Sequence, residues 1–493
     1  MDRALLVASL TETPSDDGRE VSALAGRADW LEVRADLVGD LDPDWLRARF
    51  PGRLLYTLRS RAEWGAFDGS REKRRRRILE NAPRYDLVDL EADRDLAPET
   101  AAGVPQEKRI VSWHGPAADE RGLASRLEHL VSTPAYLYKM VSRAANAGEE
   151  LAPLHLLASR RRRDLIAFAG GETGFWTRLV APRLGAPIVY GSATELPAAP
   201  GQPSITRLIE EYGLPALPPQ RWLFGVVGHP VLSSLSPRLH NAANRELSLP
   251  ALFVPFDTPE FGDFWLELVD SDAMEKLGLV LGGLAVTTPH KEVAFAVAGA
   301  TSPLAMRLEA VNTLTLKDGV WEGESTDAEG VVEAIRARGV EIAGRRAVVL
   351  GCGGAGRAAA LGLSLAGAAV TLVNRGEERG KKAAQRLKLP FLPLSGLVAR
   401  DFDLIVNATP VGRRENDELL IPIAALGEGT VVVDLVYGTQ PTPFVAAARD
   451  NGLTAVDGRE VLLRQAVPQF RNMTGRALPV EVAARALGLE PSR

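Results

Sequence analysis

The stretch Val348-Val-Leu-Gly-Cys-Gly-Gly-Ala-Gly-Arg357 decides the fold of the second half of this 493-residue chain. An apolar run of strand length leads into the spacing G-x-G-x-x-G, and an alanine-rich run of helix length follows. Gly351, Gly353 and Gly356 let the backbone approach a pyrophosphate at the N-terminus of the following helix. The same spacing also occurs where a helix and a strand simply pack closely. The strand–loop–helix context favours a dinucleotide-binding Rossmann lobe.

The end of the next predicted strand, Val370–Val373, indicates the cofactor. An NAD site places Asp or Glu there to bind the ribose hydroxyls, whereas Asn374 and Arg375 follow this strand and Arg379 comes soon after. Arginine accommodates a 2′-phosphate, so the sequence favours NADP. The alternative is that these are exposed arginines at the start of a helix.

Strand and helix patterns alternate on both sides of the glycine-rich loop. The further strands predicted here are Phe224–Val227, Ala251–Pro255, Leu279–Val286, Ala347–Leu350, Leu404–Asn407 and Val431–Leu435. The segment Asn312–Trp321 predicts a hairpin with Asp318-Gly319 as its turn. We therefore predict a two-lobed α/β unit. Its substrate-binding lobe covers residues 222–327, its Rossmann lobe covers 328–458, and helices at 459–493 pack back on the substrate-binding lobe.

The first half repeats a different pattern. Eight apolar runs are mostly separated by polar or amphipathic stretches of helix length: Ala4–Ala8, Trp30–Val33, Leu54–Leu58, Leu87–Leu90, Ile110–Trp113, Tyr136–Val141, Leu165–Ala169 and Pro187–Tyr190. Eight strand–helix alternations over roughly 200 residues predict a (β/α)8 TIM barrel, which we assign to residues 1–212. Three prolines in Gly213-Leu-Pro-Ala-Leu-Pro-Pro-Gln-Arg221 then predict a short, stiff linker at 213–221.

Polar residues gather at the C-terminal ends of the predicted barrel strands, where barrel active sites lie. They are Glu32, Arg34, Arg59, Glu91, His114 and Lys139, with Arg178 and Gln202 in later loops. Charges at the ends of apolar strands are costly unless they converge on a ligand. The alternative is a set of separate, solvated strand-end charges, but nearly every strand contributes one. Because Lys139 is expected to be desolvated in a barrel mouth with other cations nearby, its pKa should fall.

Composition and charge exclude several classes of function. The net charge of −5 suggests neither a nucleic-acid nor a membrane partner, and no apolar run reaches 18 residues. A single cysteine, Cys352, and six scattered histidines provide no disulfide framework and no metal site. We interpret the basic runs Arg71–Arg77 and Arg160–Arg163 as solvated helix faces. The opening residues resemble neither a secretory signal nor a transit peptide, so a cytoplasmic location is expected.

The second half resembles the shikimate dehydrogenase family. The resemblance covers nearly all of residues 222–485 and rests on His229-Pro-Val-Leu-Ser-Ser-Leu-Ser-Pro-Arg-Leu-His240, Val286-Thr-Thr-Pro-His-Lys291, Ala310-Val-Asn-Thr313, Ser325-Thr-Asp327 and Asn407-Ala-Thr-Pro-Val-Gly412. It implies catalytic roles for Lys291 and Asp327. The implied substrate contacts are Ser234, Ser236, Thr287, Asn312, Tyr437 and Gln465. The implied NADP(H) contacts are Gly351, Gly353, Gly354, Ala355, Gly356, Asn374, Arg375, Arg379, Asn407 and Thr409.

Residues 1–205 resemble the type I 3-dehydroquinate dehydratase family. The motifs are Asp29-Trp-Leu-Glu-Val-Arg-Ala-Asp36, Thr57-Leu-Arg-Ser-Arg-Ala-Glu63, Ser112-Trp-His114, Tyr138-Lys139-Met140, Thr177-Arg178 and Ala199-Pro-Gly-Gln202. The resemblance implies Lys139 as the imine-forming residue, His114 as the general acid and base, and Glu63 as the residue that orients His114. It also implies substrate contacts at Glu32, Arg34, Arg59, Arg178 and Gln202, with Arg178 holding the substrate carboxylate.

The two resemblances together imply a bifunctional enzyme that converts 3-dehydroquinate to 3-dehydroshikimate and then to shikimate. It would act on small molecules, as a monomer or weak homodimer. Several positions depart from the families: Gly115, Ala198, Ala285, Ser325, Gly376, Thr439 and Val461. The alternatives are a quinate/shikimate dehydrogenase with one weakened half, and a metabolite sensor without turnover. Retention of Lys139, His114, Lys291 and Asp327 argues against the sensor.

Overall fold

The computed structural model describes residues 3–144, 146–414 and 417–489. Contacts between Cα atoms divide the chain into two compact units. The first consists of Met1–Trp222 with Val254–Val280, and the second of Leu223–Phe253 with Leu281–Arg493. Within the described ranges, no helix combines the length and the apolar character needed to cross a membrane.

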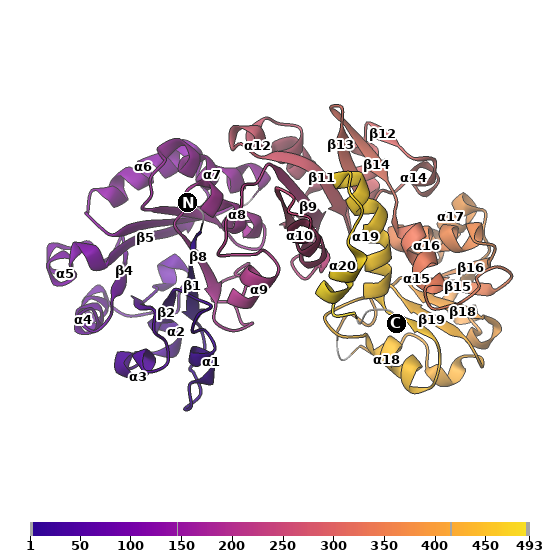
Figure 1. The fold of residues 1–493 in the computed structure, drawn as a ribbon, viewed down its shortest axis with the longest axis horizontal. Coiled ribbons are helices and arrows are strands. Elements are labelled where there is room, and N and C mark those ends of the chain that lie inside the picture. Colours follow the sequence, from indigo (N-terminus) through magenta and orange to yellow (C-terminus); the bar gives the residue numbers. More distant parts are fainter. Residues whose placement is uncertain (1–2, 145, 415–416, 490–493) are drawn as a thin grey trace. The chain divides into compact units, whose positions relative to one another are not determined.

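Eight parallel strands form the core of the first unit, in the order β7-β6-β5-β4-β3-β2-β1-β8. They are β1 (Leu5–Leu10), β2 (Trp30–Arg34), β3 (Arg53–Thr57), β4 (Leu87–Glu91), β5 (Arg109–Pro116), β6 (Leu137–Arg143), β7 (Leu165–Gly170) and β8 (Ile188–Ser192). The sheet is a nearly closed barrel, drawn from indigo to magenta in Figure 1. All eight predicted strands are confirmed, because apolar residues on both faces of a parallel strand are a strong pattern.

Helices surround these strands on the outside (Figure 1). They are α1 (Arg19–Ser22), α2 (Ala35–Val38), α3 (Pro43–Arg47), α4 (Arg71–Asn81), α5 (Pro98–Gly103), α6 (Glu120–Val131), α7 (Ala147–Arg160), α8 (Phe175–Val180) and α9 (Ile205–Glu210). The later segment of this unit adds α11 (Phe261–Phe264), which contacts α7, and α12 (Ala273–Lys276). The interpretation of the run Arg71–Arg77 as a solvated face is wrong for one member. Arg74 is buried, because its guanidinium lies 2.6 Å from the Asp95 carboxylate beneath the helix.

Two six-stranded sheets follow. The first has the order β10-β9-β11-β13-β14-β12 and consists of β9 (Trp222–Gly228), β10 (Ala251–Asp257), β11 (Val280–Val286), β12 (Ala300–Thr301), β13 (Thr313–Lys317) and β14 (Val320–Glu324). The predicted hairpin is confirmed, since β13 and β14 are antiparallel and Lys317 is paired with Val320. Asp318 and Gly319 both have positive φ, 48° and 79°, as a tight two-residue turn requires.

The second of these sheets is the predicted Rossmann sheet, with the order β17-β16-β15-β18-β19-β20. Its strands are β15 (Arg346–Leu350), β16 (Ala369–Asn374), β17 (Phe391–Pro393), β18 (Leu404–Asn407), β19 (Val431–Asp434) and β20 (Ala455–Val456). The sequence interpretation found the four longest strands and missed β17 and β20. Those two are three and two residues long, too short for a periodic pattern.

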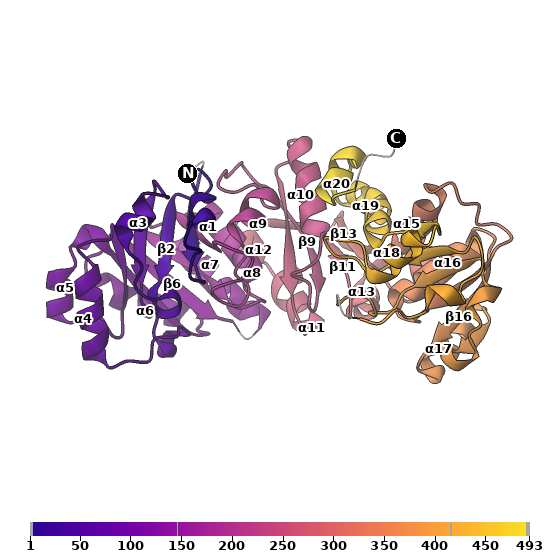
Figure 2. The same cartoon turned by 90° about the horizontal axis from the view of Figure 1, so that it is seen from below.

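The helices of the second unit are α10 (Ser236–Glu246), α13 (Lys291–Val297), α14 (Pro303–Leu308), α15 (Asp327–Arg336), α16 (Gly354–Leu365), α17 (Glu377–Leu387), α18 (Pro443–Asp450), α19 (Gly458–Thr474) and α20 (Val480–Ala486). Helices α19 and α20 lie beside α10 in both views (Figures 1 and 2). An apolar cluster joins them, with Leu239 from α10, Phe470 from α19 and Ala483 from α20 all fully buried. Helix α19 begins with a capping box, in which Asp457 and Glu460 bind each other's backbone N–H.

Candidate active sites

A cavity of about 270 Å³ opens at the C-terminal ends of the barrel strands. Of the eight site residues predicted for this half, all but Glu63 line the cavity: Glu32, Arg34, Arg59, His114, Lys139, Arg178 and Gln202. Residues separated by more than 150 positions in sequence meet there because parallel strands end on the same rim. The rim residue Glu91 does not line the cavity. It is fully buried and accepts hydrogen bonds from the backbone and hydroxyl of Ser60, each 2.7 Å long.

Lys139 extends from β6 into this cavity and is only 6% exposed. Burial lowers the pKa of Lys139 to about 8, with Glu32 and Asp89 opposing the shift and Arg59 and Arg34 adding to it. The nearest carboxylate oxygen, Oδ2 of Asp89, lies 4.0 Å from Nζ, too far for a hydrogen bond. The expected fall in pKa is therefore confirmed, and its main cause is loss of water rather than neighbouring cations.

His114 lies on β5, the strand next to Lys139, and is held by Glu63. Oε2 of Glu63 lies 3.0 Å from Nδ1 of His114 and accepts the backbone N–H of His114 at 3.0 Å. Because Oε2 of Glu63 accepts the hydrogen bond of the backbone N–H, it also accepts the hydrogen bond from the ring of His114. The ring proton then belongs on Nδ1, and Nε2 keeps a free lone pair. Burial and nearby cations lower the pKa of His114 well below its usual value, so the ring is neutral.

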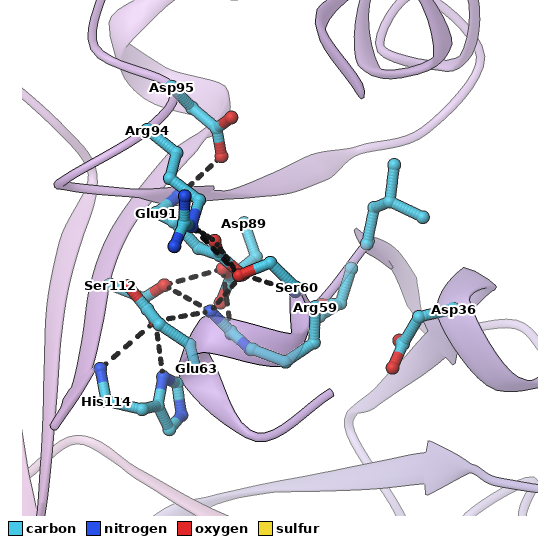
Figure 3. Close-up of polar contacts among 12 residues, drawn as sticks. Asp36, Arg59, Ser60, Glu63, Asp89, Glu91, Arg94, Asp95, Ser112 and His114 are labelled. Atoms are coloured by element: carbon cyan, nitrogen blue, oxygen red, sulfur yellow. Dashed lines mark hydrogen bonds and ion pairs between the residues drawn. The ribbon is translucent and has the colours of Figure 1, made fainter. Parts of the chain in front are cut away.

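Arg59 continues the contact chain beneath the cavity. Its guanidinium lies 3.0 Å from Glu63 and 2.9 Å from Asp89, and it donates to Oγ of Ser112 at 2.9 Å. Figure 3 shows these contacts running from His114 through Glu63 to Arg59 and then to Asp89 and Ser112. Burial raises the pKa of Glu63, and the Arg59 cation 3.0 Å away opposes this shift. The orientation of His114 is thus fixed by a buried ionic network.

Glu32, Arg34 and Gln202 reach the cavity with partners of their own. Glu32 accepts hydrogen bonds from Oγ of Ser9 at 2.5 Å and Oγ1 of Thr57 at 2.8 Å. Arg34 forms a two-point ion pair with Asp36, with N–O distances of 2.9 and 2.8 Å. Gln202 donates to Ser9 at 3.2 Å and accepts the Ala198 backbone N–H at 2.9 Å. These pairings fix the three side chains before a ligand arrives.

Arg178 is the exception, because this buried cation has no carboxylate partner among the described residues. It is 7% exposed, stacks over Phe168 at 4.2 Å and makes one long contact of 3.4 Å with the carbonyl of Tyr190. Its Nε has no hydrogen-bond partner in the described part of the chain. Burial lowers the pKa of Arg178 to about 10. An isolated buried guanidinium facing a cavity is prepared for an anion supplied from outside.

The second unit contains its own cavity of about 280 Å³. All eight catalytic and substrate-binding residues predicted for this half line it: Ser234, Ser236, Thr287, Lys291, Asn312, Asp327, Tyr437 and Gln465. Ala355 and Thr409 of the predicted cofactor set border the same cavity. Burial raises the pKa of Tyr437, and a side-chain hydrogen bond with Ser234 opposes this shift. The glycine-rich loop and the predicted substrate contacts therefore meet at one site.

Lys291 begins helix α13 and Asp327 begins helix α15, and their side chains face each other. Nζ of Lys291 lies 2.5 Å from Oδ2 of Asp327. The other carboxylate oxygen, Oδ1, accepts from Nδ2 of Asn312 at 2.7 Å. Asn312 is fixed in turn, because its Oδ1 accepts the backbone N–H of Thr326 at 2.8 Å. The result is a paired ammonium and carboxylate at the wall of the cavity.

The glycine-rich loop closes tightly between β15 and α16. Gly351 has φ of +102°, a conformation that side chains rarely adopt. A Cβ at Gly356 would lie 1.9 Å from the carbonyl oxygen of Gly351. A Cβ at Gly354 would lie 3.1 Å from Cδ of Lys291, so the loop passes directly beside that lysine. Only glycine fits at positions 351 and 356. The start of α16 then offers free N–H groups to an anion.

The remaining predicted cofactor contacts differ in exposure. Arg375 and Arg379 are exposed, and Nη2 of Arg379 lies 4.0 Å from where a Cβ of Gly353 would stand. Asn374 braces the loop by accepting the Cys352 backbone N–H at 3.2 Å. Asn407 is buried, and its amide donates to Asp434 and to the carbonyl of Val411, both at 2.9 Å. Asn407 thus shapes the loop that carries Thr409.

Several cavity residues were missed from the sequence. In the barrel they are Ser9, Thr57, Trp64, Val141, Arg143, Phe168 and Tyr190, and in the second unit His229, Arg413 and Gln469. Ser9 and Thr57 stand at or next to strand ends, so a rule that counted hydroxyls with charges would have found them. Tyr190 lies in the middle of β8, where that rule does not apply. One family departure has a steric reason, since a Cβ at Gly115 would lie 2.0 Å from the Trp113 ring.

Comparison with known proteins assigns both halves. Residues 7–216 match the family model of type I 3-dehydroquinase, and residues 226–314 match that of the shikimate dehydrogenase substrate binding domain. A shikimate dehydrogenase (NADP(+)) of Acidiphilium cryptum is 41% identical over 251 residues, which cover 50% of this chain and 88% of the relative. The chain belongs to the shikimate dehydrogenase family. A type I 3-dehydroquinase domain precedes the shikimate dehydrogenase unit, so the chain has a lyase domain and an oxidoreductase unit.

Further relatives extend this assignment. A bifunctional 3-dehydroquinate dehydratase/shikimate dehydrogenase, chloroplastic, of Arabidopsis thaliana is 29% identical over 488 residues, covering 92% of this chain and 79% of that protein. The crystal structure of a shikimate dehydrogenase from Aquifex aeolicus has a TM-score of 0.50 and 30% identity, and covers 55% of this chain and 97% of its own. The order of the dehydroquinase barrel and the shikimate dehydrogenase unit is thus shared with a single-chain relative.

Proposed function

We propose that the dehydroquinase barrel dehydrates 3-dehydroquinate to 3-dehydroshikimate and that the shikimate dehydrogenase unit reduces this product to shikimate with NADPH. One observation carries the proposal. A desolvated lysine, a neutral histidine and an unpartnered arginine converge on the barrel cavity, as a carboxylate-bearing ketone that must lose water requires. The relatives that share both halves are named for these two activities.

The dehydration follows from the placement of Lys139 and His114. The free amine of Lys139 adds to the ketone carbon, and the resulting carbinolamine takes up one proton from solvent and loses its hydroxyl as water, which leaves a protonated imine. The positive charge acidifies the C–H on the adjacent carbon, and Nε2 of neutral His114 takes that proton. The electron pair left behind expels the hydroxyl one carbon further on, and His114 returns its proton to the departing oxygen. Hydrolysis of the imine then releases the product and restores the amine.

The residues around Lys139 and His114 bind and orient the substrate. The Arg178 guanidinium binds the substrate carboxylate, because it is the one buried cation at the described cavity wall without an ionic partner. Glu32, Arg34 and Gln202 contact the ring hydroxyls from positions already fixed by hydrogen bonds. Glu63 keeps the ring proton of His114 on Nδ1, so that Nε2 is free to accept the substrate proton. It also stabilises the imidazolium while His114 carries that proton.

The reduction needs a proton at the carbonyl oxygen of 3-dehydroshikimate. The ammonium of Lys291, 2.5 Å from Asp327, can donate a hydrogen bond to that oxygen and pass its proton as the alcohol forms. Asp327 then stabilises the ammonium again when it takes up a proton. Ser234 and Ser236 offer hydroxyls for the substrate carboxylate, and Thr287, Asn312, Tyr437 and Gln465 line the rest of the cavity.

The loop geometry fits NADP(H), which supplies the hydride when bound. A pyrophosphate would lie against Gly351, Gly353, Gly354, Ala355 and Gly356, where Cβ atoms at Gly351 and Gly356 would strike neighbouring backbone. Arg375 and Arg379 are available to a 2′-phosphate, and the strand β16 ends in Asn374 rather than in a carboxylate. Thr409, on the loop that Asn407 shapes, completes the cofactor side.

The division into a barrel at 1–212, a linker at 213–221, lobes at 222–327 and 328–458 and helices at 459–493 is part of this proposal. A cytoplasmic location and a monomeric or weakly dimeric state also stay predictions. Cell fractionation and light scattering of the purified protein test these two.

A coupled assay tests the two activities together. Purified protein receives 3-dehydroquinate and NADPH, and the absorbance of the conjugated product and of NADPH are followed. We expect the product absorbance to rise without NADPH and one NADPH to be oxidised per 3-dehydroquinate when NADPH is present. If the absorbance does not rise and NADPH is not consumed, both activities are contradicted. A rise without NADPH loss would leave the dehydratase alone.

A further inference from the structure

The barrel cavity contains a phenol that the mechanism above leaves unused. Tyr190 lies on β8, where it pairs with Val7 of β1, and its side chain lines the cavity with Lys139 and Arg178. Tyr190 is 3% exposed, and its hydroxyl has no hydrogen-bond partner among the described residues. An unpaired buried hydroxyl destabilises the folded state, so its partner is expected to come from the cavity itself.

The ring of Tyr190 lies against the reacting amine. Nζ of Lys139 is 4.0 Å from the centroid of the ring, within the range of a cation–π contact. The free amine gains little from such a contact, whereas the protonated imine formed on the same nitrogen is a cation and gains more. The ring face therefore favours the charged states of this nitrogen, including the intermediate.

The hydroxyl can act only as a neutral group. Burial raises the pKa of Tyr190 well above its usual value, and the Glu32 and Asp89 carboxylates add to this shift. A neutral phenol both donates and accepts one hydrogen bond. Glu32 and Arg34 on the cavity wall are already paired, and Arg178 is a cation suited to a carboxylate, so the Tyr190 hydroxyl adds a neutral donor that these side chains do not provide.

We propose that Tyr190 is a specificity and positioning residue of the dehydroquinase site. Its hydroxyl donates a hydrogen bond to an oxygen of the bound polyhydroxylated substrate, and its ring holds the nitrogen of Lys139 in place as the imine forms. The inference rests on the proposed imine mechanism. It adds a contact made by the barrel strand β8, from which the sequence motifs selected no residue.

Two variants separate the hydroxyl from the ring. Tyr190→Phe removes only the hydroxyl and should raise KM for 3-dehydroquinate about three- to tenfold with kcat nearly unchanged, the loss of one neutral hydrogen bond. Tyr190→Leu also removes the ring, and should lower the apparent pKa for trapping Lys139 with borohydride by up to about one unit. Tyr85→Phe is the matched control, because this buried phenol bonds the carbonyl of Leu41 outside the cavity.

The outcomes distinguish this inference from the proposed function. If wild type forms no borohydride adduct at Lys139, the imine mechanism itself is wrong. If wild type is trapped and Tyr190→Phe keeps the wild-type KM, the hydroxyl does not bind substrate, and an enclosed water is its partner. An unchanged trapping pKa in Tyr190→Leu would overturn the positioning role of the ring. The amplitude of trapping counts competent sites in each variant, which separates these effects from misfolding.

Discussion

The two lysines proposed for catalysis occupy opposite electrostatic environments. Lys139 is buried in the barrel cavity, its nearest carboxylate oxygen is 4.0 Å away, and burial lowers its pKa to about 8. Lys291 lies on the wall of the shikimate dehydrogenase cavity, with Asp327 at 2.5 Å. An amine that must attack a carbonyl carbon has to be neutral, whereas an amine that must give a proton to a carbonyl oxygen has to be charged. Each environment favours the form that its reaction needs.

The same contrast holds for the groups that we propose to bind the substrate carboxylate. The barrel offers Arg178, a buried cation without an ionic partner in the described chain. The shikimate dehydrogenase unit offers the hydroxyls of Ser234 and Ser236, which are neutral and need no compensation. In the barrel, the free protein therefore contains an unpaired buried cation that a substrate carboxylate can neutralise. The shikimate dehydrogenase unit offers neutral hydroxyls instead. Substitutions at the two sites should therefore differ in their effects on activity and on stability.

The largest expected effect comes from exchanging each lysine for alanine. Lys139→Ala should lower dehydratase kcat by at least about 10⁴-fold and leave the reduction of 3-dehydroshikimate unchanged, because the nucleophile is lost. Lys291→Ala should do the reverse, lowering only the reductase rate. Each variant is the control of the other, and both activities are measured on each protein. A loss of both activities in either variant would contradict the separation of the two sites.

Arg178→Met should act in opposite directions on activity and stability. Without the guanidinium, kcat/KM for 3-dehydroquinate should fall about 10²- to 10³-fold, since a charge-assisted pair with the substrate carboxylate is lost. Replacing an unpartnered buried cation by an apolar chain should stabilise the barrel by about 1–4 kcal/mol. Steady-state kinetics and thermal unfolding measure the two effects. Arg178→Lys, which keeps a charge in the cavity, is the control, and a destabilised Arg178→Met would show that the cation has an internal partner.

A smaller effect is expected from pH alone. Because the folded pKa of Lys139 is about 8, below the usual value of 10.5, about a tenth of the amine is free at pH 7 and nearly all of it above pH 9. Dehydratase kcat/KM should thus rise about tenfold between pH 7 and pH 9 and then level off, as a profile over pH 6–10 would measure. A half-maximal point near pH 10.5 would contradict the desolvated lysine.

The sequence predicts most of this architecture, and the reason lies in the strands. Parallel strands buried on both faces are continuous apolar runs, so all eight barrel strands are recognisable, and the charges at their ends mark the rim. The G-x-G-x-x-G loop is likewise readable because Gly351 and Gly356 are sterically required. Lys139 and His114 could be selected on this basis, whereas Arg178, which was expected in a loop, lies in helix α8.

What the sequence does not predict depends on packing between strands. Arg74 belongs to a run of surface-type residues, and only the position of Asp95 under the helix explains its burial. Asp89 and Ser112 lie on neighbouring strands, and their bond to each other beneath Arg59 follows from strand order rather than from a motif. Tyr190 lies in the middle of β8, where an aromatic residue normally belongs to the core. Its unpartnered hydroxyl is visible only in the folded barrel.

The contrast between the two lysines has one most direct test. The protein is incubated with 3-dehydroquinate, treated with sodium borohydride and digested, and the lysine carrying the reduced adduct is identified by mass spectrometry. We expect an adduct on Lys139 and an unmodified Lys291, although a ketone occupies both sites during turnover. An adduct on Lys291, or the absence of one on Lys139, would contradict the assignment of a free nucleophilic amine to the barrel and a paired ammonium to the shikimate dehydrogenase unit.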